Sequence, residues 1–226
     1  MEPNYEKAAT LAAVTLIDHG IKASPVSTLP ILKRTPGVLA MSFTEISSLL
    51  GMDRKDLVPM FGHVNQDAVT FVDLVDGKPH YIVAYNQQLP FSLVQRALAR
   101  ELAHIVLKHD GSLPEEIRTE EARCFAHHLL APRALIHTVQ ASGIRLTIEV
   151  LGNLTGCYER CLYSMRKLPG VHIPPELNST LRDNFMPYAL NFFEFQHILA
   201  LEDVSALADF GNYMEGYEEQ GGYYDQ

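Results

Sequence analysis

Three polar residues, Arg100, Glu101 and His104, interrupt a segment that is otherwise mainly apolar from Leu93 to Val106. A segment of this kind is expected to form a buried helix. Positions three and four apart on a helix share one side, so His104 is expected beside both Arg100 and Glu101. Because a buried polar group without a partner costs free energy, these side chains are candidates for a site or a paired cluster.

Zinc peptidases use residues of these types at this spacing. Two histidines four positions apart hold the metal from one helical face, and the glutamate after the first histidine acts as the general base. In this sequence Glu101 and His104 occupy the glutamate and second-histidine positions, and Arg100 occupies the position of the first histidine. A guanidinium has no lone pair to donate and stays charged in proteins, so Arg100 cannot be a zinc ligand.

A second segment makes the comparison more specific. Residues 120–132 read E-E-A-R-C-F-A-H-H-L-L-A-P, and His109 stands before Asp110 after the first segment. Together the two segments resemble the two motifs of the ImmA/IrrE family, and the resemblance extends over about 2–168. It implies a gluzincin-like, zinc-dependent endopeptidase. Members encoded on phages and integrative elements, or in stress-response loci, act on helix-turn-helix repressors.

By position, the resemblance implies that His104 and Glu121 are metal ligands and that Glu101 is the general base. Glu120 is the alternative carboxylate ligand. A zincin fold also implies that a strand beside the metal-binding helix receives the substrate as an added β-strand.

Two residues depart from the family pattern. Arg100 stands at the first ligand position, and Arg123 stands where the family usually has asparagine. Two protein ligands are too few for an ordinary zinc site. We therefore expect a pseudo-peptidase in which zinc is absent or substoichiometric and Arg100 forms a salt bridge with Glu121 or Glu101. An active zinc endopeptidase with an altered ligand set is the first alternative, and an accidental match of a helical protein to the motif is a further reading.

Three neighbouring residues are candidates to replace the missing ligand. His109 lies five positions after His104, which on a continuous helix turns it off the ligand face. His128 lies two turns beyond Glu121, roughly 10 Å along the helix axis. Cys124, one turn from Glu121, is the best-placed candidate, although a buried thiol is its ordinary role.

The surrounding pattern predicts the elements that hold these residues. Residues 68–75 and 80–85 are rich in β-branched and aromatic side chains and flank Asp76-Gly77, which predicts a β-hairpin. Capping-box spacing at 42–45 and 112–115 predicts two helix starts. The predicted fold class is α+β and mostly helical, with a zincin-like core, a small antiparallel sheet or hairpin, and a following helical module.

The sequence divides into four predicted segments. They are a metallopeptidase-like domain over 1–142, a helix-turn-helix-like module over 143–170, a helical extension over 171–208 and an acidic, disordered tail over 209–226. DNA binding through the helix pair at 147–168 is a second alternative function. The pair combines basic residues with Glu159, whereas specific DNA binders normally show a basic face.

Charge and composition narrow the partners and the compartment. The chain has 18 Lys and Arg against 27 Asp and Glu, and nine of these acids lie in 183–226, which has no Lys or Arg. The neutral remainder argues against nucleic acid as a partner. Three cysteines make no disulfide framework, no apolar run is long enough for a membrane span, and the N-terminus lacks a signal-peptide pattern. We expect a cytoplasmic protein with a protein substrate or partner.

Overall fold

The computed structural model describes residues 2–57, 67–165, 168 and 170–201. Within these residues the strands are β1 (Val38–Ser42), β2 (Ala68–Val75) and β3 (Lys78–Tyr85). The helices are α1 (Tyr5–Asp18), α2 (Thr28–Arg34), α3 (Phe43–Leu50), α4 (Arg54–Leu57), α5 (Phe91–Val106), α6 (Glu115–Leu130), α7 (Arg133–Ala141), α8 (Ile148–Thr155), α9 (Glu159–Met165) and α10 (Pro175–Leu201). The mostly helical α+β class predicted from the sequence is confirmed.

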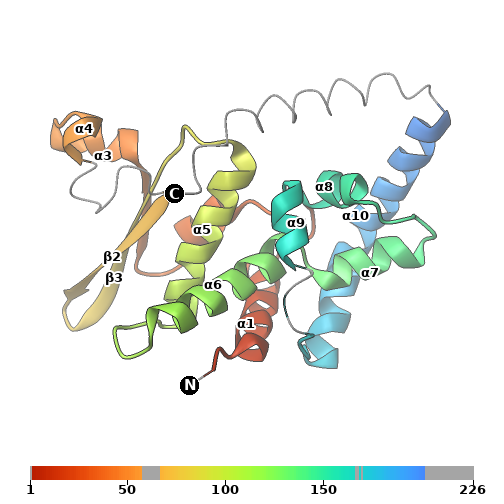
Figure 1. The fold of residues 1–226 in the computed structure, drawn as a ribbon, viewed down its shortest axis with the longest axis horizontal. Coiled ribbons are helices and arrows are strands. Elements are labelled where there is room, and N and C mark those ends of the chain that lie inside the picture. The colour runs from red at the N-terminus through yellow and green to blue at the C-terminus, as the bar shows by residue number, and fades with distance from the viewer. Residues whose placement is uncertain (1, 58–66, 166–167, 169, 202–226) are drawn as a thin grey trace.

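The elements are arranged from one end of the molecule to the other (Figure 1). The sheet with α3 and α4 lies at one end, α7, α8 and α10 lie at the other, and α5 and α6 cross the middle. This arrangement places α5 and α6, which carry both sequence motifs, next to each other at the centre.

The predicted hairpin forms and gains a third strand. β2 and β3 pair antiparallel, and Asp76 and Gly77 both have positive φ, as the two central residues of a type I′ turn require. β1, which was not predicted, pairs with β3 in parallel and makes a mixed sheet in the order β1-β3-β2. Within the described residues β2 is therefore an edge strand, and both β2 and β3 contact α5.

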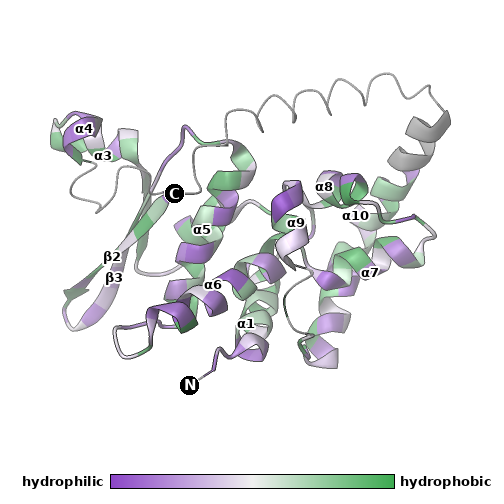
Figure 2. Ribbon diagram, in the orientation of Figure 1, coloured by the Kyte–Doolittle hydropathy of each residue, from purple (hydrophilic) through white to green (hydrophobic). Residues whose placement is uncertain are grey.

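Both faces of the sheet are covered in part by helices. α5 packs on the face that presents the fully buried Val83, and the helices α3 and α4 cover part of the other face. Apolar and polar residues both occur along the length of α5 (Figure 2). One side of the helix is apolar and contacts the sheet and α6, while other positions remain accessible. The apolar side of α5 thus fixes the helix on the sheet, and this fixes the positions of its polar residues.

The main core extends from α1 to α10. α1 presents Ala8, Ala9, Ala12 and Ala13 to it, and these small side chains allow α1 to pack closely against α6. α6 is buried over most of its length, with Phe125 and Leu129 fully inaccessible. The same core includes residues of α9 and α10, among them Leu162 and Phe185.

Some predicted boundaries needed correction. The capping box at 42–45 forms, since the Ser42 hydroxyl accepts from the Glu45 N–H and the Glu45 carboxylate accepts from the Ser42 N–H. The predicted capping box at 112–115 does not form: α6 starts after Pro114, and Ser112 donates to Asp110 instead. The short helices α2 and α4 were not predicted.

Two sequence expectations fall outside what the structure describes. The acidic tail at 209–226 and the basic residues Arg166 and Lys167 of the helix pair lie outside the described residues. No helix in the described part of the chain combines the length and the apolar character that a bilayer crossing needs.

Candidate functional site

The candidate site begins on the middle turns of α5. Glu101 is buried at 8 % exposure, whereas Arg100 and His104 are partly exposed. The apolar side of α5 packs against the sheet and α6, while Glu101 reaches a partner on β2 and His104 reaches a partner on the segment between α5 and α6.

Glu101, the predicted general base, is held by the edge strand. The Thr70 hydroxyl of β2 donates to Glu101 Oε2 at 2.7 Å. Burial raises the pKa of the Glu101 carboxyl, and the Thr70 hydrogen bond and the Arg100 charge oppose that rise only in part. Desolvation therefore dominates at this carboxyl, and the neutral form is favoured more than in water.

Glu121, the predicted carboxylate ligand, lies on the buried side of α6. Its Oε1 accepts the backbone N–H of Asn4 at 2.7 Å, and its Oε2 lies 2.9 Å from His109 Nε2. Asn4 is the N-cap residue of α1, so the carboxylate sits at the positive end of that helix. Both oxygens of Glu121 are engaged by groups of the protein itself.

His109 joins the site, which the sequence did not predict. The argument from a continuous helix was wrong because α5 ends at Val106: Lys108 takes a positive φ of 57°, and the His109 N–H donates to the His104 carbonyl at 2.9 Å. This reversal turns the His109 ring back over the helix end. Its position before Asp110 and Gly111 was the sequence signal that could have indicated a role.

His104 and His109 are linked through their rings. The two Nδ1 atoms are 2.8 Å apart, which completes a hydrogen-bonded chain from Glu121 through His109 to His104. With neutral rings, His109 Nε2–H donates to Glu121 and His109 Nδ1 accepts from His104. Burial, then the charges of His109 and of two arginines, lower the pKa of His104 to about 4, so this imidazole is neutral at neutral pH.

Arg100 does not make the predicted salt bridge. Among the described residues, neither Glu101 nor Glu121 has a carboxylate oxygen within ion-pair distance of the Arg100 guanidinium. The prediction of a direct bridge is therefore wrong. Glu121 is instead hydrogen-bonded to His109, and Glu101 accepts a hydrogen bond from Thr70.

These side chains, as arranged, do not converge on a metal. His109 directs one ring nitrogen to each neighbour, and a single ion cannot take both, since the two nitrogens point in different directions from the ring. Both Glu121 oxygens are occupied, and Arg100 adds a fixed positive charge. Across the described residues no group of three His, Cys, Asp or Glu side chains is placed to hold an ion.

The other candidate ligands named from the sequence, Cys124, His128 and Glu120, are buried or interact with other residues. Cys124 donates to the Tyr5 carbonyl, and burial raises the pKa of its thiol to about 12, so it is not a thiolate. His128 is buried at 5 % exposure in α6. Glu120, the alternative carboxylate, pairs with Arg123 and accepts from the Tyr5 hydroxyl.

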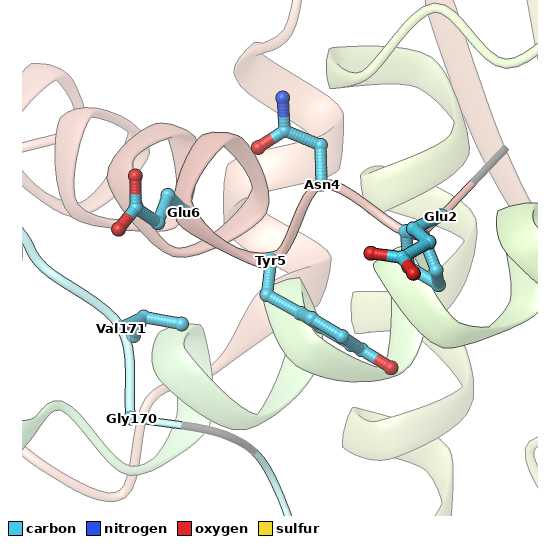
Figure 3. Close-up of a pocket in the computed structure, with 7 residues that line it drawn as sticks. Glu2, Asn4, Tyr5, Glu6, Gly170 and Val171 are labelled. Carbon is cyan, nitrogen blue, oxygen red and sulfur yellow. The ribbon is translucent and has the colours of Figure 1, made fainter.

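A shallow pocket lies beside Asn4 (Figure 3). It is lined by residues 2–6 of the N-terminal segment and by Gly170 and Val171. Its titratable lining consists of Glu2, Glu6 and Tyr5, without histidine or cysteine, so it offers no metal-ligand set of its own. Its lining residue Asn4 donates its backbone N–H to Glu121, and Tyr5 contacts Glu120 and Cys124.

Comparison with known proteins identifies the central part of the chain. Residues 53–150 match the family model described as the IrrE N-terminal-like domain. The matched segment includes β2, β3, α5, α6 and α7, and with them every residue of the hydrogen-bonded site except Asn4. No curated protein and no solved structure matches the chain. Residues 53–150 thus form an IrrE N-terminal-like domain, which supports the resemblance of this part of the chain to the ImmA/IrrE family.

Proposed function

We propose that this protein is a pseudo-peptidase of the ImmA/IrrE family, which binds a segment of a regulatory protein without zinc-dependent cleavage. The observation behind the proposal is Arg100 at the position of the first histidine ligand, next to a Glu121 carboxylate whose two oxygens are already hydrogen-bonded. A catalytic zinc site needs three protein ligands and an open position. Only His104 and Glu121 remain, and Glu121 would have to give up its present partners.

The geometry supports peptide binding at the edge strand. Within the described residues β2 has one unpaired side, and Thr70 connects it directly to Glu101 of α5. Val72 and Leu74 follow Thr70 on the same face at 61 % and 70 % exposure. An extended segment added to β2 would therefore meet apolar side chains and pass the Arg100–His104 turn.

The biological setting of the proposal follows the family. We propose a helix-turn-helix repressor as the partner, in a phage, mobile-element or stress-response system in the cytoplasm. Three free, buried cysteines suit a reducing compartment.

One observation favours the alternative of an active zinc endopeptidase. His109 lies within hydrogen-bond distance of both His104 and Glu121, so a rotation of its ring would bring a third donor to them. In that case His109, His104 and Glu121 would form the altered ligand set.

Metal analysis of protein purified without chelator decides between the two. For the wild type we expect zinc well below one ion per chain, and for Arg100→His close to one, because the substitution restores the missing imidazole. Arg100→Gln removes the same charge without adding a donor and is the matched control. Stoichiometric zinc in the wild type that His104→Ala or His109→Ala removes would overturn the pseudo-peptidase proposal.

The partner is tested by mixing the full chain with helix-turn-helix repressors from the same genome. We expect a complex on size-exclusion chromatography and an intact repressor by mass spectrometry. Cleavage of the repressor by the wild type would contradict the proposal, and cleavage that appears only with Arg100→His would support it.

A further inference from the structure

Exposed apolar side chains gather on the sheet. Twelve large apolar side chains are exposed among the described residues, and six of them belong to the three strands: Leu39, Phe71, Val72, Leu74, Val75 and Ile82. Four of these six lie in the second part of the edge strand β2. A contiguous exposed apolar patch marks a surface that binds another protein or a ligand. The second part of β2 is therefore a candidate interaction surface.

The strand register arranges these side chains on both faces of the sheet. Leu39 and Phe71 both pair with Ile82, so the three form one exposed row across the sheet. Side chains alternate along a strand, which places Val72 and Leu74 on the opposite face, on which α5 packs. The turn of the hairpin lies well away from α3 and α4 (Figure 1), so these helices leave the row uncovered. A strand added to β2 would therefore meet apolar side chains on both of its faces.

The hairpin turn fixes which backbone groups of β2 point outward. The two-residue turn at 76–77 is flanked by Val75 and Lys78, and the residues that flank such a turn make a hydrogen-bonded pair. Hydrogen-bonded pairs alternate along an antiparallel ladder, so every second residue before Val75 directs its N–H and C=O away from β3. An added strand would pair with these outward groups. They belong to Leu74, Val72 and Thr70.

The Asp73 side chain occupies one of these outward groups. Its Oδ1 accepts the N–H of Leu74 at 2.8 Å on the exposed edge of the strand. Asp73 is exposed and belongs to none of the ion pairs between the described residues. A charge at such a place protects an edge strand from non-specific pairing. A strand that extends beyond Val72 must therefore draw the carboxylate away from Leu74.

A basic residue on the added strand has the chemistry for this. Residues directly opposite each other in neighbouring strands have Cβ atoms about 5 Å apart, and opposite charges at such positions attract. A Lys or Arg opposite Asp73 would pair with its carboxylate, and the Leu74 N–H would then be free to bond to the added strand. The edge of β2 thus favours a strand with a basic residue at this level over one with a neutral or acidic residue.

We propose that β2 binds an extended segment of a partner protein that has a Lys or Arg side chain opposite Asp73. The neighbouring positions of that segment, opposite Phe71, Val72 and Leu74, are apolar. This proposal rests on the peptide-binding function proposed above. It gives that function a specificity: the partner segment is apolar on both faces, with one basic residue that Asp73 recognises.

A positional-scanning peptide library tests the proposal without knowledge of the partner sequence. The peptides are as long as β2, eight residues, and are acetylated and amidated so that only side chains bring charge. We expect the full-length wild type to select Lys and Arg at one position and apolar residues on both sides of it. The variant Asp73→Asn keeps an acceptor for the Leu74 N–H but removes the charge, and it should lose the basic selection.

The matched control is Asp76→Asn. It removes the same charge from the same hairpin, and asparagine suits the positive φ of 52° at this turn position. The chain has a net charge of −9, which attracts basic peptides without specificity, and both variants lower this attraction equally. We expect Asp76→Asn to keep the basic selection.

The best peptide then gives the magnitude by fluorescence anisotropy at about 0.15 M salt, which screens distant charges. Replacing its basic residue with glutamine should weaken binding to the wild type about two- to fivefold, the range of a cross-strand charge pair. The same replacement should weaken binding to Asp76→Asn by the same factor and leave binding to Asp73→Asn unchanged. Thermal unfolding shows that each variant is folded, and Asp73→Asn should melt with the wild type, because the side chain is exposed.

The outcomes separate this proposal from the function on which it rests. Selection of apolar residues without a basic preference would overturn the role of Asp73 and leave peptide binding intact. A basic preference that persists in Asp73→Asn, or that Asp76→Asn loses as well, would overturn it in the same way. Selection of acidic residues at every position would contradict the charge pairing. Binding of no peptide at all would overturn both proposals.

Discussion

At the scale of single residues, two glutamates show how environment sets the behaviour of one chemical group. Burial raises the pKa of Glu101, whereas hydrogen bonds from the Ser42 backbone and side chain lower that of Glu45. A carboxyl with a raised folded pKa favours the folded state at low pH, and this contribution is lost as the pH rises through that pKa. The reverse holds for Glu45, whose contribution is present at neutral pH and is lost as the pH falls.

Glu101→Gln is therefore expected to raise the melting temperature at about pH 7.5, with a difference from the wild type that shrinks as the pH falls toward 4. The amide avoids a buried charge, and its oxygen can still accept from Thr70. Differential scanning fluorimetry across this pH range measures the effect. Glu45→Gln, the control of opposite sign, should lower the melting temperature at pH 7.5. A similar decrease of the melting temperature in Glu101→Gln would show that a cation stabilises the ionised Glu101.

The sequence predicted which residue types lie at the site but not how they pair. Arg100, Glu101, His104 and Glu121 could be located because helical spacing and the motif pattern fix positions along each helix. Their partners could not, because these come from distant parts of the chain: Asn4 lies 117 positions before Glu121, and Thr70 lies 31 positions before Glu101. The predicted salt bridge of Arg100 failed for this reason.

At the scale of elements, two short helices end in the same way but meet different surroundings. α3 and α8 are each eight residues long and stop at a left-handed glycine, Gly51 or Gly156, whose N–H donates to the carbonyl four residues earlier. A Cβ on Gly51 would meet nothing within 4 Å, whereas a Cβ on Gly156 would lie 2.7 Å from Pro25 Cβ. Because Gly156 has no Cβ, the C-terminal end of α8 can lie this close to Pro25.

Substitution of the two glycines separates backbone strain from this contact. Gly51→Ala should destabilise the protein by about 1 kcal/mol, the cost of a left-handed alanine. Gly156→Ala should cost about 2–4 kcal/mol, because the overpacking against Pro25 is added. Urea denaturation of both variants measures the difference. Equal losses would mean that the loop at Pro25 moves aside without cost.

Elements with strong local signals were predicted, and those that depend on distant partners were not. α7 and the β2–β3 hairpin follow from their own residues, the hairpin through its Asp76-Gly77 turn. β1 is five residues long and is stabilised by parallel pairing with β3, about forty positions later in the chain, so no local pattern identifies it. The end of α5 at Val106 was missed as well, and with it the return of His109 to the site.

At the scale of the whole molecule, α6 connects the site to the main core. Its first half contributes Glu121 to the site, and α6 as a whole packs against α1, α5 and α9. Its second half includes His127 and His128, at 3 % and 5 % exposure, and burial is the first cause that lowers the pKa of each to about 4. The core therefore contains two imidazoles that resist protonation.

These histidines make the global fold sensitive to acid. Between the ordinary histidine pKa near 6.5 and about 4, the unfolded chain takes up a proton at each position and the folded protein does not, so stability falls as the pH falls. At pH 5 this amounts to about 2 kcal/mol for one such histidine.

The variant His128→Leu places an apolar side chain at this core position. Between pH 7.5 and 5 its free energy of unfolding is expected to fall by about 2 kcal/mol less than that of the wild type. Urea denaturation at the two pH values measures this, and the comparison uses the change with pH rather than the absolute stability, which repacking also affects. His137→Gln, at an exposed position of the neighbouring helix α7, should leave the loss unchanged. If both variants lose as much as the wild type, His128 accepts a proton in the folded state, and the second half of α6 must be more open to water than its burial indicates.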